Sequence, residues 1–236
     1  MLVTLTALGP FTIDMYLPAF PAIETGFGVD PAMVQLTLTG TTVGFAAGQL
    51  IVGPLSDRVG RKVPLVVAAV LHIAASVAAA LAPTILMLGI FRVLQGFGAA
   101  ASGVVSMAMV RDLFAGRHLI KMMSRLALVN GLAPVIAPVV GSQLLSIMDW
   151  RGIFWVLAGY GAFVSAAVAI FVKETLPKDV RSTDTRSLRS RYQVLFKDRT
   201  YLGMVAMAGL NFTALFAYLS ASPFLFQQTF GMCEQQ

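Results

Sequence analysis

Two charged residues lie inside otherwise apolar runs of this 236-residue sequence, Asp14 in the first run and Arg92 in the fourth. Charged side chains are costly in a lipid bilayer, and they usually belong to pathways for ions, protons or substrates. A carboxylate beside a buried cation can stay ionised until the pairing is broken, and it can then take up a proton. We therefore expect Asp14 and Arg92 to couple proton movement to solute movement. The alternative is a static ion pair that locks two helices together.

A second group of charges lies between Gly53 and Lys62, where the sequence reads GPLSDRVGRK. Its glycines, Gly53 and Gly60, permit a tight reversal and a close approach of helices. Asp57 and Arg61 would be fixed charges at the membrane face. Each residue alone is explained by turn glycines and by the basic residues that membrane proteins keep on their cytoplasmic side. The complete pattern favours a functional loop between two membrane spans.

The fifth apolar run contains two prolines four residues apart, Pro134 and Pro138, flanked by Gly131 and Gly141. Both prolines lie on one face of a helix and remove backbone donors, so we expect the helix to bend there. The glycines would let a neighbouring helix approach closely. The alternative is that Gly and Pro are simply commoner in membrane helices than in soluble ones.

The elements that position these residues are apolar. Of the residues, 57% are hydrophobic and 12% are charged, against roughly 25% charged in a soluble domain. The runs predict seven spans, because a crossing needs about 20 apolar residues. They lack the ten-residue length and strict alternation of barrel strands, so we predict an all-α transmembrane fold. The predicted spans cover residues 2–20, 34–54, 64–82, 85–108, 122–146, 152–172 and 200–222.

These spans divide the chain into a six-helix bundle (1–172), a cytoplasmic linker (173–199) and a seventh span that begins an incomplete carboxy-terminal half (200–236). Fifteen of the 17 lysines and arginines follow spans two, four and six. Basic residues stay on the cytoplasmic side, so we expect a cytoplasmic amino terminus in a bacterial inner membrane. The basic linker is also suited to anionic lipid headgroups.

Other classes of protein are disfavoured. The net charge of +6 does not indicate a nucleic-acid partner, because the basic residues lie between hydrophobic spans. The one cysteine, Cys233, excludes a disulfide framework, and His72 and His118 lack metal-ligand spacing. His72 has no evident partner and is interpreted as structural. We expect no metal and no enzyme activity, since no nucleophile-base pair appears.

Several of these patterns resemble the major facilitator superfamily. The stretch from Gly53 to Lys62 is similar to its signature G-x-L-a-D-r-x-G-r-k, and the run from Gly131 to Gly141 resembles the antiporter motif of its drug exporters, in a variant without the usual Gly-Pro pair. The chain looks most like the Bcr/CflA branch, exporters of bicyclomycin, chloramphenicol and related drugs. Further matches are Leu88-x-x-x-Arg92-x-x-Gln95-Gly96-x-Gly98-Ala99-Ala100, Asp14-Met15-Tyr16-Leu17-Pro18-Ala19 and Asp149-Trp150-Arg151-x-x-Phe154-Trp155.

The resemblance implies roles for particular residues. It places a charge relay of Asp57, Arg61 and Asp112 at a cytoplasmic gate, where Asp57 faces a helix of the other half and Arg61 pairs with Asp112. It links Arg92 to proton coupling, in support of the pair with Asp14. The remaining candidates are the gate-loop residues Gly53, Arg58, Gly60 and Lys62, and the possible pocket residues Tyr16, Gln95, Asn130, Asn211 and Phe212.

The predicted function is proton-coupled efflux of small amphipathic drugs by alternating access, driven by the proton gradient without a cofactor. The expected partners are a small-molecule drug, protons, membrane lipid and a missing carboxy-terminal half. Spans one to three and four to six would be inverted repeats around a midplane site. One alternative is a superfamily importer, a proton symporter of a small metabolite. Another is a truncated, non-transporting membrane protein, because the family has twelve spans and this chain stops after seven.

Overall fold

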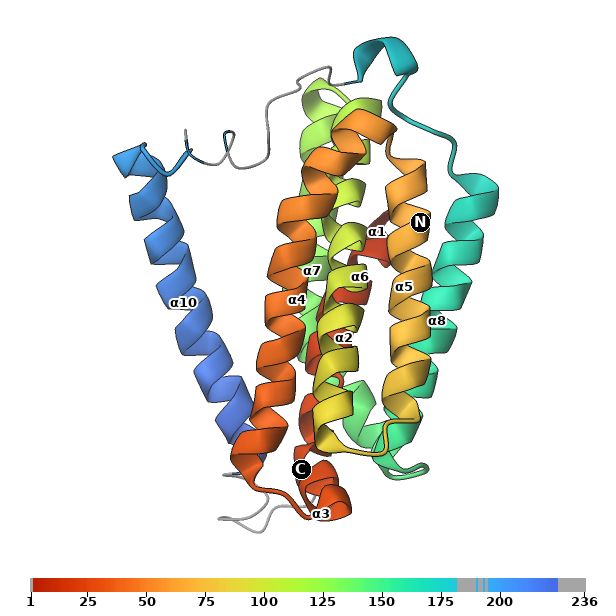
Figure 1. The fold of residues 1–236 in the computed structure, drawn as a ribbon. Helices are drawn as coiled ribbons and strands as arrows, with labels where there is room; N and C mark the ends of the chain where they lie inside the picture. Colours follow the sequence, from red (N-terminus) through yellow and green to blue (C-terminus); the bar gives the residue numbers. More distant parts are fainter. Residues whose placement is uncertain (1, 182–189, 191–192, 194, 225–236) are drawn as a thin grey trace.

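The computed structural model describes residues 2–181, 190, 193 and 195–224 (Figure 1). Helices account for almost all of this part of the chain, and no strand occurs within it, which confirms the predicted all-α class. The helices are α1 (Leu2–Thr6), α2 (Leu8–Asp14), η1 (Leu17–Ala19), α3 (Phe20–Phe27), α4 (Pro31–Val59), α5 (Lys62–Ala80), α6 (Ile85–Leu113), α7 (Gly116–Leu145), α8 (Trp150–Phe171), η2 (Lys178–Val180) and α10 (Arg199–Phe224).

The first predicted span is not one helix over 2–20. It is divided into α1, α2, η1 and α3, and it continues to Phe27. Pro10 and Pro18 have no backbone N–H, so they cannot donate to the carbonyls of Thr6 and Asp14. Helices α1 and α2 end at these two residues. The prediction of a single helix was therefore wrong, and the interruption leaves Asp14 at a helix end.

The stretch from Gly53 to Lys62 is also not a loop. Its first seven residues, through Val59, extend α4, and Pro54 lies inside that helix. The turn is confined to Gly60 and Arg61, and the φ of Gly60 is +110°. Gly53 lies in the helix, where an added Cβ would be 3.3 Å from Val104 of α6. Packing of α4 against α6 keeps a Gly-Pro sequence helical that would otherwise favour a break.

Helix α6 lies at the centre of the bundle, between α4 and α5, and α8 packs on the far side of α5 (Figure 1). Small residues allow this close approach. A Cβ at Gly48 of α4 would lie 2.6 Å from the carbonyl oxygen of Phe97, and one at Gly98 of α6 would lie 2.6 Å from that of Ala68. The close contacts set the register between the helices that carry the candidate site.

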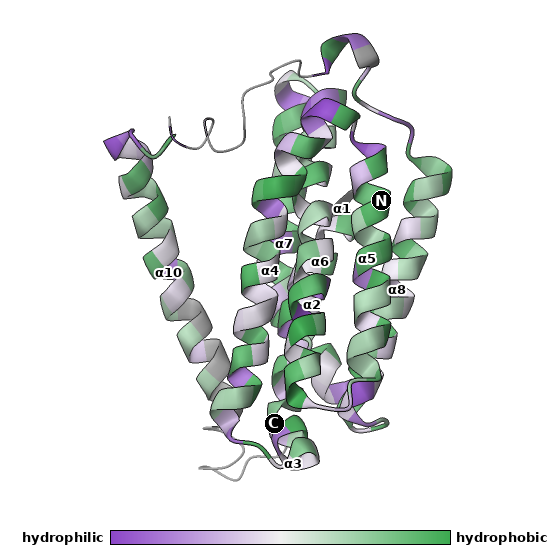
Figure 2. Cartoon of the chain, in the orientation of Figure 1, coloured by the Kyte–Doolittle hydropathy of each residue, from purple (hydrophilic) through white to green (hydrophobic). Residues whose placement is uncertain are grey.

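Five helices of the described chain, α4 to α8, are long and apolar enough to cross a membrane. Hydrophobic residues cover their length, and hydrophilic residues gather toward their ends (Figure 2). Helix α10 covers the predicted seventh span and approaches the bundle beside η1 and α3. Helix α7 stays continuous through Pro134 and Pro138. Much of the predicted linker (182–189, 191–192 and 194) lies outside the described residues.

Candidate functional site

A cluster of paired charges lies where α4 ends and α5 begins. The Arg61 guanidinium donates from Nη1 to Asp57 Oδ1 (2.5 Å) and from Nε to Asp112 Oδ2 (2.9 Å). Nη1 also donates to the hydroxyl of Ser56 (2.8 Å). Asp112 comes from the last turn of α6, so the cluster joins two helices and a turn. The structure thus brings together the three residues of the predicted charge relay, which we name the charge cluster.

Arg61 is only 7% exposed. Burial alone would lower its pKa, but the hydrogen bonds and charges of Asp112 and Asp57 outweigh this effect and raise it. The guanidinium therefore stays charged at every physiological pH. Beside the charge cluster is a cavity of about 300 Å³, lined by Gly53, Ser56, Asp57, Arg61, Val104, Met107, Ala108, Arg111 and Asp112.

The segment that follows α8 binds this cluster from outside. Glu174 accepts hydrogen bonds from the backbone N–H of Arg61 (2.8 Å) and of Lys62 (3.2 Å), which are free donors at the start of α5. Thr175 donates to Asp112 Oδ2 (3.2 Å), and Arg181 lies 3.9 Å from the Glu174 carboxylate. Sequence reasoning missed Glu174 and Thr175. The signal that could have found Glu174 is an acidic residue directly after a predicted span, among basic residues.

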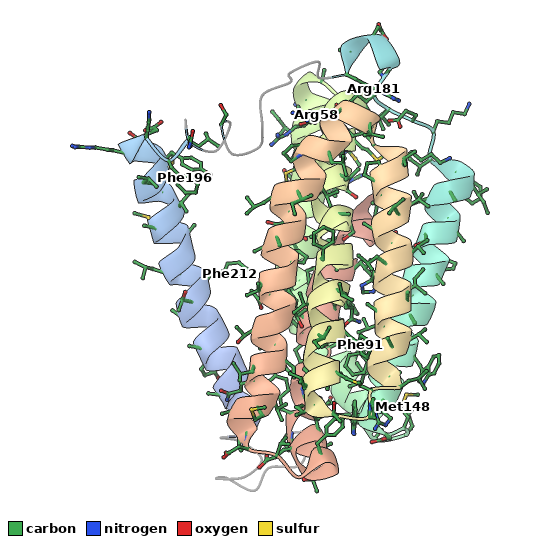
Figure 3. The ribbon with its side chains drawn as sticks, in the orientation of Figure 1. Arg58, Phe91, Met148, Arg181, Phe196 and Phe212 are labelled. Carbon is green, nitrogen blue, oxygen red and sulfur yellow. The ribbon has the colours of Figure 1, made fainter. Side chains whose placement is uncertain are left out.

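The contacts of Glu174 also set its charge. Its partial burial would raise the pKa, but the N–H groups of Arg61, Leu176 and Lys62 and the charge of Arg181 together lower it. Arg181 and Arg58 lie at the same end of the bundle, far from Phe91 and Met148 (Figure 3). Lys62 donates from Nζ to the carbonyl of Ala169 in α8 (2.8 Å). The turn at Gly60 and Arg61 and the described start of the predicted linker therefore meet at one end of the bundle.

A second polar centre surrounds Arg92, deep in the bundle. Arg92 is completely buried, and its Nη1 donates to the carbonyl of Thr12 (2.9 Å) and to Oε1 of Gln95 (2.7 Å). The Thr12 carbonyl is at the interrupted end of α2, where carbonyls lose their helical partners. The guanidinium carbon lies 4.3 Å from the ring centroid of Tyr16 and 5.6 Å from that of Phe154, within cation–π range.

Arg92 and Asp14 form no ion pair in the part of the chain that the structure describes. Asp14 is 3% exposed, and its Oδ1 has no hydrogen-bond partner there. Nε and Nη2 of Arg92 likewise lack partners among the described residues. A static ion pair therefore does not describe this conformation. Two buried ionisable groups lie on adjacent helices with unused hydrogen-bonding capacity, which is rare in native structures unless it serves a purpose.

The Arg92 centre extends into α5. Gln95 donates from Nε2 to the hydroxyl of Ser76 (2.7 Å), and that hydroxyl donates to the carbonyl of His72 (2.7 Å). His72 Nδ1 in turn lies 3.3 Å from the carbonyl of Gln95. Sequence reasoning missed Ser76 and found no partner for His72. We name Arg92, Gln95, Ser76 and His72 the buried arginine network.

The five predicted pocket residues are not gathered together. Tyr16 and Gln95 are buried, and the Tyr16 hydroxyl bonds to Thr37 (2.8 Å). The other three, Asn130, Asn211 and Phe212, are exposed on α7 and α10. None of the five lines the cavity beside the charge cluster.

The glycines and prolines of α7 differ in their surroundings. A Cβ added to Gly141 would collide with the carbonyl of Met15, so this glycine lets α7 pack against the chain just after Asp14. Gly131 has no such neighbour among the described residues, and Pro134 and Pro138 are half-buried.

Similar proteins identify the family. Residues 2–233 match the family described as Major Facilitator Superfamily. The chain is 41% identical to an uncharacterized MFS-type transporter, YdgK, of Bacillus subtilis (98% of this chain, 58% of the relative). It is 36% identical to a bicyclomycin resistance protein homolog of Haemophilus influenzae (97% and 58%). It is 30% identical to the multidrug resistance protein MdtL of Klebsiella pneumoniae (96% and 57%). The chain thus spans less than three fifths of these relatives.

Solved structures agree on the fold. A bacterial homolog of the human lysosomal transporter Spinster, inward-facing and unoccupied, has a TM-score of 0.74 at 14% identity, covering 99% of this chain and 55% of its own. A D-xylose–proton symporter has a TM-score of 0.67 at 18% identity, covering 99% and 62%. These two structures show the fold that the chain shares. The match over residues 2–233, together with the relatives above, shows that this chain belongs to the Major Facilitator Superfamily, a family of membrane transporters and not of enzymes, as predicted.

Proposed function

We propose that this chain is the amino-terminal part of a proton-coupled exporter of small amphipathic drugs in a bacterial inner membrane, with its amino terminus in the cytoplasm. The names of the relatives from Haemophilus influenzae and Klebsiella pneumoniae support drug export. The observation that carries the proposal is that Asp14 and Arg92 are both buried and form no ion pair among the residues that the structure describes. No cofactor is required, because the proton gradient supplies the energy.

Asp14 is the group that binds and releases the proton. Its carboxylate is at the interrupted end of α2, and Arg92 is anchored two residues earlier, on the carbonyl of Thr12. A small movement of α2 relative to α6 therefore changes the distance between the two charges. Protonation removes the negative charge of Asp14, and deprotonation restores its attraction to Arg92. Proton binding is thereby linked to a helix movement that opens the drug site to one side.

The charge cluster acts as the cytoplasmic gate. Its hydrogen bonds hold α4, α5 and α6 together at one end of the bundle, and the cavity beside it is suited to a helix end from the remaining part of the transporter. The chain spans 57–58% of the three relatives reported above. We therefore expect transport to require the missing carboxy-terminal half, with membrane lipid around both.

Asp14→Asn tests the coupling. The transporter is expressed from its complete gene, reconstituted in vesicles and given a proton gradient and radiolabelled chloramphenicol. The variant should lose pH-driven transport by about 100-fold, because an amide cannot carry the proton. Asp30→Asn, which changes an exposed carboxylate before α4, should transport normally. Unchanged pH-driven transport in Asp14→Asn would refute the proposal.

The direction of transport is tested in cells. An exporter lowers the cellular drug content and raises resistance in a susceptibility panel, and an uncoupler removes both effects. An importer would instead accumulate its solute. Reconstitution of residues 1–236 alone should give no transport, and robust transport by that fragment would contradict the need for a second half.

A further inference from the structure

Ser76 joins α5 to the Arg92 centre. Its hydroxyl lies 2.7 Å from Nε2 of Gln95 and 2.7 Å from the carbonyl of His72. Ser76, Gln95, His72 and Arg92 are all completely buried. Solvent does not reach these side chains, so a polar atom that loses its contact costs free energy unless it finds another partner within the protein.

The donor and the acceptor of each hydrogen bond between Arg92, Gln95, Ser76 and His72 are fixed by the chemistry of the groups. A serine hydroxyl has a single proton, and that of Ser76 goes to the His72 carbonyl. The Ser76 oxygen must then accept from the amide nitrogen of Gln95. The opposite end of the amide, Oε1, consequently faces Nη1 of Arg92, which has only donors. A reversed amide would direct its NH₂ group at the guanidinium, donor against donor.

The contact is rigid because α5 and α6 are held close together. A Cβ on Gly98 would lie 2.6 Å from the backbone nitrogen of His72, so only glycine permits this separation. His72 Nδ1 and the Gln95 carbonyl, 3.3 Å apart, form a second contact between the same helices. Ser76 is therefore held at a constant place relative to Gln95.

Arg92 depends on this arrangement. The Gln95 oxygen is one of two hydrogen-bond acceptors that it has among the described residues, and the other is the Thr12 carbonyl. Without Ser76, the Gln95 NH₂ group would be buried without an acceptor and would rotate to find one. The Gln95 oxygen would then no longer accept from Arg92. Among the described residues, the Thr12 carbonyl of α2 would be the one remaining acceptor for the guanidinium.

We infer that Ser76 is a positioning residue for proton coupling, which orients the Gln95 amide so that Arg92 is held away from a permanent pairing with Asp14. The inference rests on the proposed function, in which Arg92 and Asp14 carry the coupling. Ser76 acts only through Gln95, and this dependence separates it from a serine that merely fills space.

Two measurements on the complete transporter test the role. In solid-state NMR spectra of the protein in lipid bilayers, the guanidinium ¹⁵N resonances of Arg92 are identified by their loss in Arg92→Lys. They should shift in Ser76→Ala. In vesicles, pH-driven transport of radiolabelled chloramphenicol should fall about tenfold in Ser76→Ala, as displacement of a reacting group predicts. Counterflow exchange, which needs no proton gradient, should be retained.

Three variants serve as controls. Ser76→Thr keeps the hydroxyl and should restore both the resonances and coupled transport. Ser102→Ala removes another buried hydroxyl, which donates to Ala99 of its own helix (2.6 Å), and should change neither. In a Gln95→Met background, Ser76→Ala should have no further effect, because the residue through which it acts is gone.

Failure of the inference differs from failure of the proposed function. If Ser76→Ala leaves the Arg92 resonances unmoved, or is fully additive with Gln95→Met, the positioning role is refuted even if coupling stands. Loss of counterflow together with coupled transport would also refute it, because that result indicates a general structural defect. If Arg92→Lys leaves coupled transport unchanged, the proposed function fails, and the NMR result still decides what orients Arg92.

Discussion

The charge cluster and the buried arginine network differ in the partners of their central arginine. Arg61 lies in the turn between α4 and α5, at one end of the bundle, with two carboxylates within 2.9 Å. Arg92 is fully buried, stacks on Tyr16, and binds no carboxylate among the described residues while Asp14 Oδ1 stays unpartnered. A paired charge resists change, whereas an unpaired buried charge responds strongly to a neighbour's protonation. The difference agrees with the proposed gate at one end of the bundle and the proposed proton coupling within it.

The largest effect should follow Arg92→Lys, which keeps the charge and removes the planar fork. The lysine ammonium lacks the planar group that stacks on Tyr16, and it lacks the two further nitrogens, Nε and Nη2, that have no partner among the described residues. We expect pH-driven transport by the complete transporter to fall about 100-fold in vesicles. Arg151→Lys is the matched control, since Arg151 stacks on Trp150 (4.2 Å) outside the network. Equal losses of pH-driven transport in Arg92→Lys and Arg151→Lys would contradict a specific requirement for the Arg92 guanidinium.

Asp112→Asn should weaken the charge cluster. The asparagine oxygen can still accept from Arg61 Nε but carries no charge, and a hydrogen bond to a charged group contributes about 1.5–3 kcal/mol, which sets the largest expected loss of stability. Chemical unfolding in detergent measures this change, and thiol labelling of a cysteine placed at Ala108, in the adjacent cavity, measures opening of the cluster. Asp179→Asn, at a carboxylate outside the cluster, is the control. Unaltered stability and labelling would mean that the cluster does not hold the helices together.

Gly60→Ala should destabilise the turn by about 1–2 kcal/mol, because its backbone conformation (φ +110°, ψ 166°) is one that only glycine adopts readily. The new methyl would also lie 2.5 Å from Glu174 Oε2. Gly159→Ala in α8 provides the comparison, since no atom of the described chain lies within 4 Å of its added Cβ. Thermal unfolding of both variants decides the matter, and equal melting temperatures would contradict the prediction.

Glu174 should give the smallest effect, visible as a pH dependence. Its pKa is lower in the folded protein than the ordinary value of 4.5, so the ionised form favours folding. The stability difference between the wild type and Glu174→Gln should be complete above pH 4.5 and should diminish as the pH falls through the lower folded value. Unfolding measured in steps from pH 7 to pH 3 tests this. A difference that grows on acidification would contradict the assigned contacts.

Some of the architecture was predictable because its signals are local. Apolar runs without charges predicted an all-helical fold, which is confirmed, and five of the described helices are long and apolar enough to cross a membrane. The motif from Gly53 to Lys62 predicted the superfamily, which the match over residues 2–233 confirms. The predictions of a loop at Gly53–Val59 and of a single first helix were wrong, because the effect of a proline on a helix depends on how that helix is packed. Pro54 is tolerated within α4, which is packed along α6, whereas Pro10 and Pro18 interrupt a helix at Thr6 and Asp14.

The sequence by itself determined the number of apolar runs, the placement of basic residues, and the two charges inside apolar runs, because each depends on residue type and spacing alone. Only the tertiary structure decided how these charges are partnered. Asp57, Arg61 and Asp112 meet, whereas Arg92 and Asp14 form no ion pair within the described part of the chain. Pairing depends on how helices distant in sequence cross, and close contacts such as Gly98 against His72 determine that crossing. Ser76 and Glu174 acquire their proposed importance only from this packing.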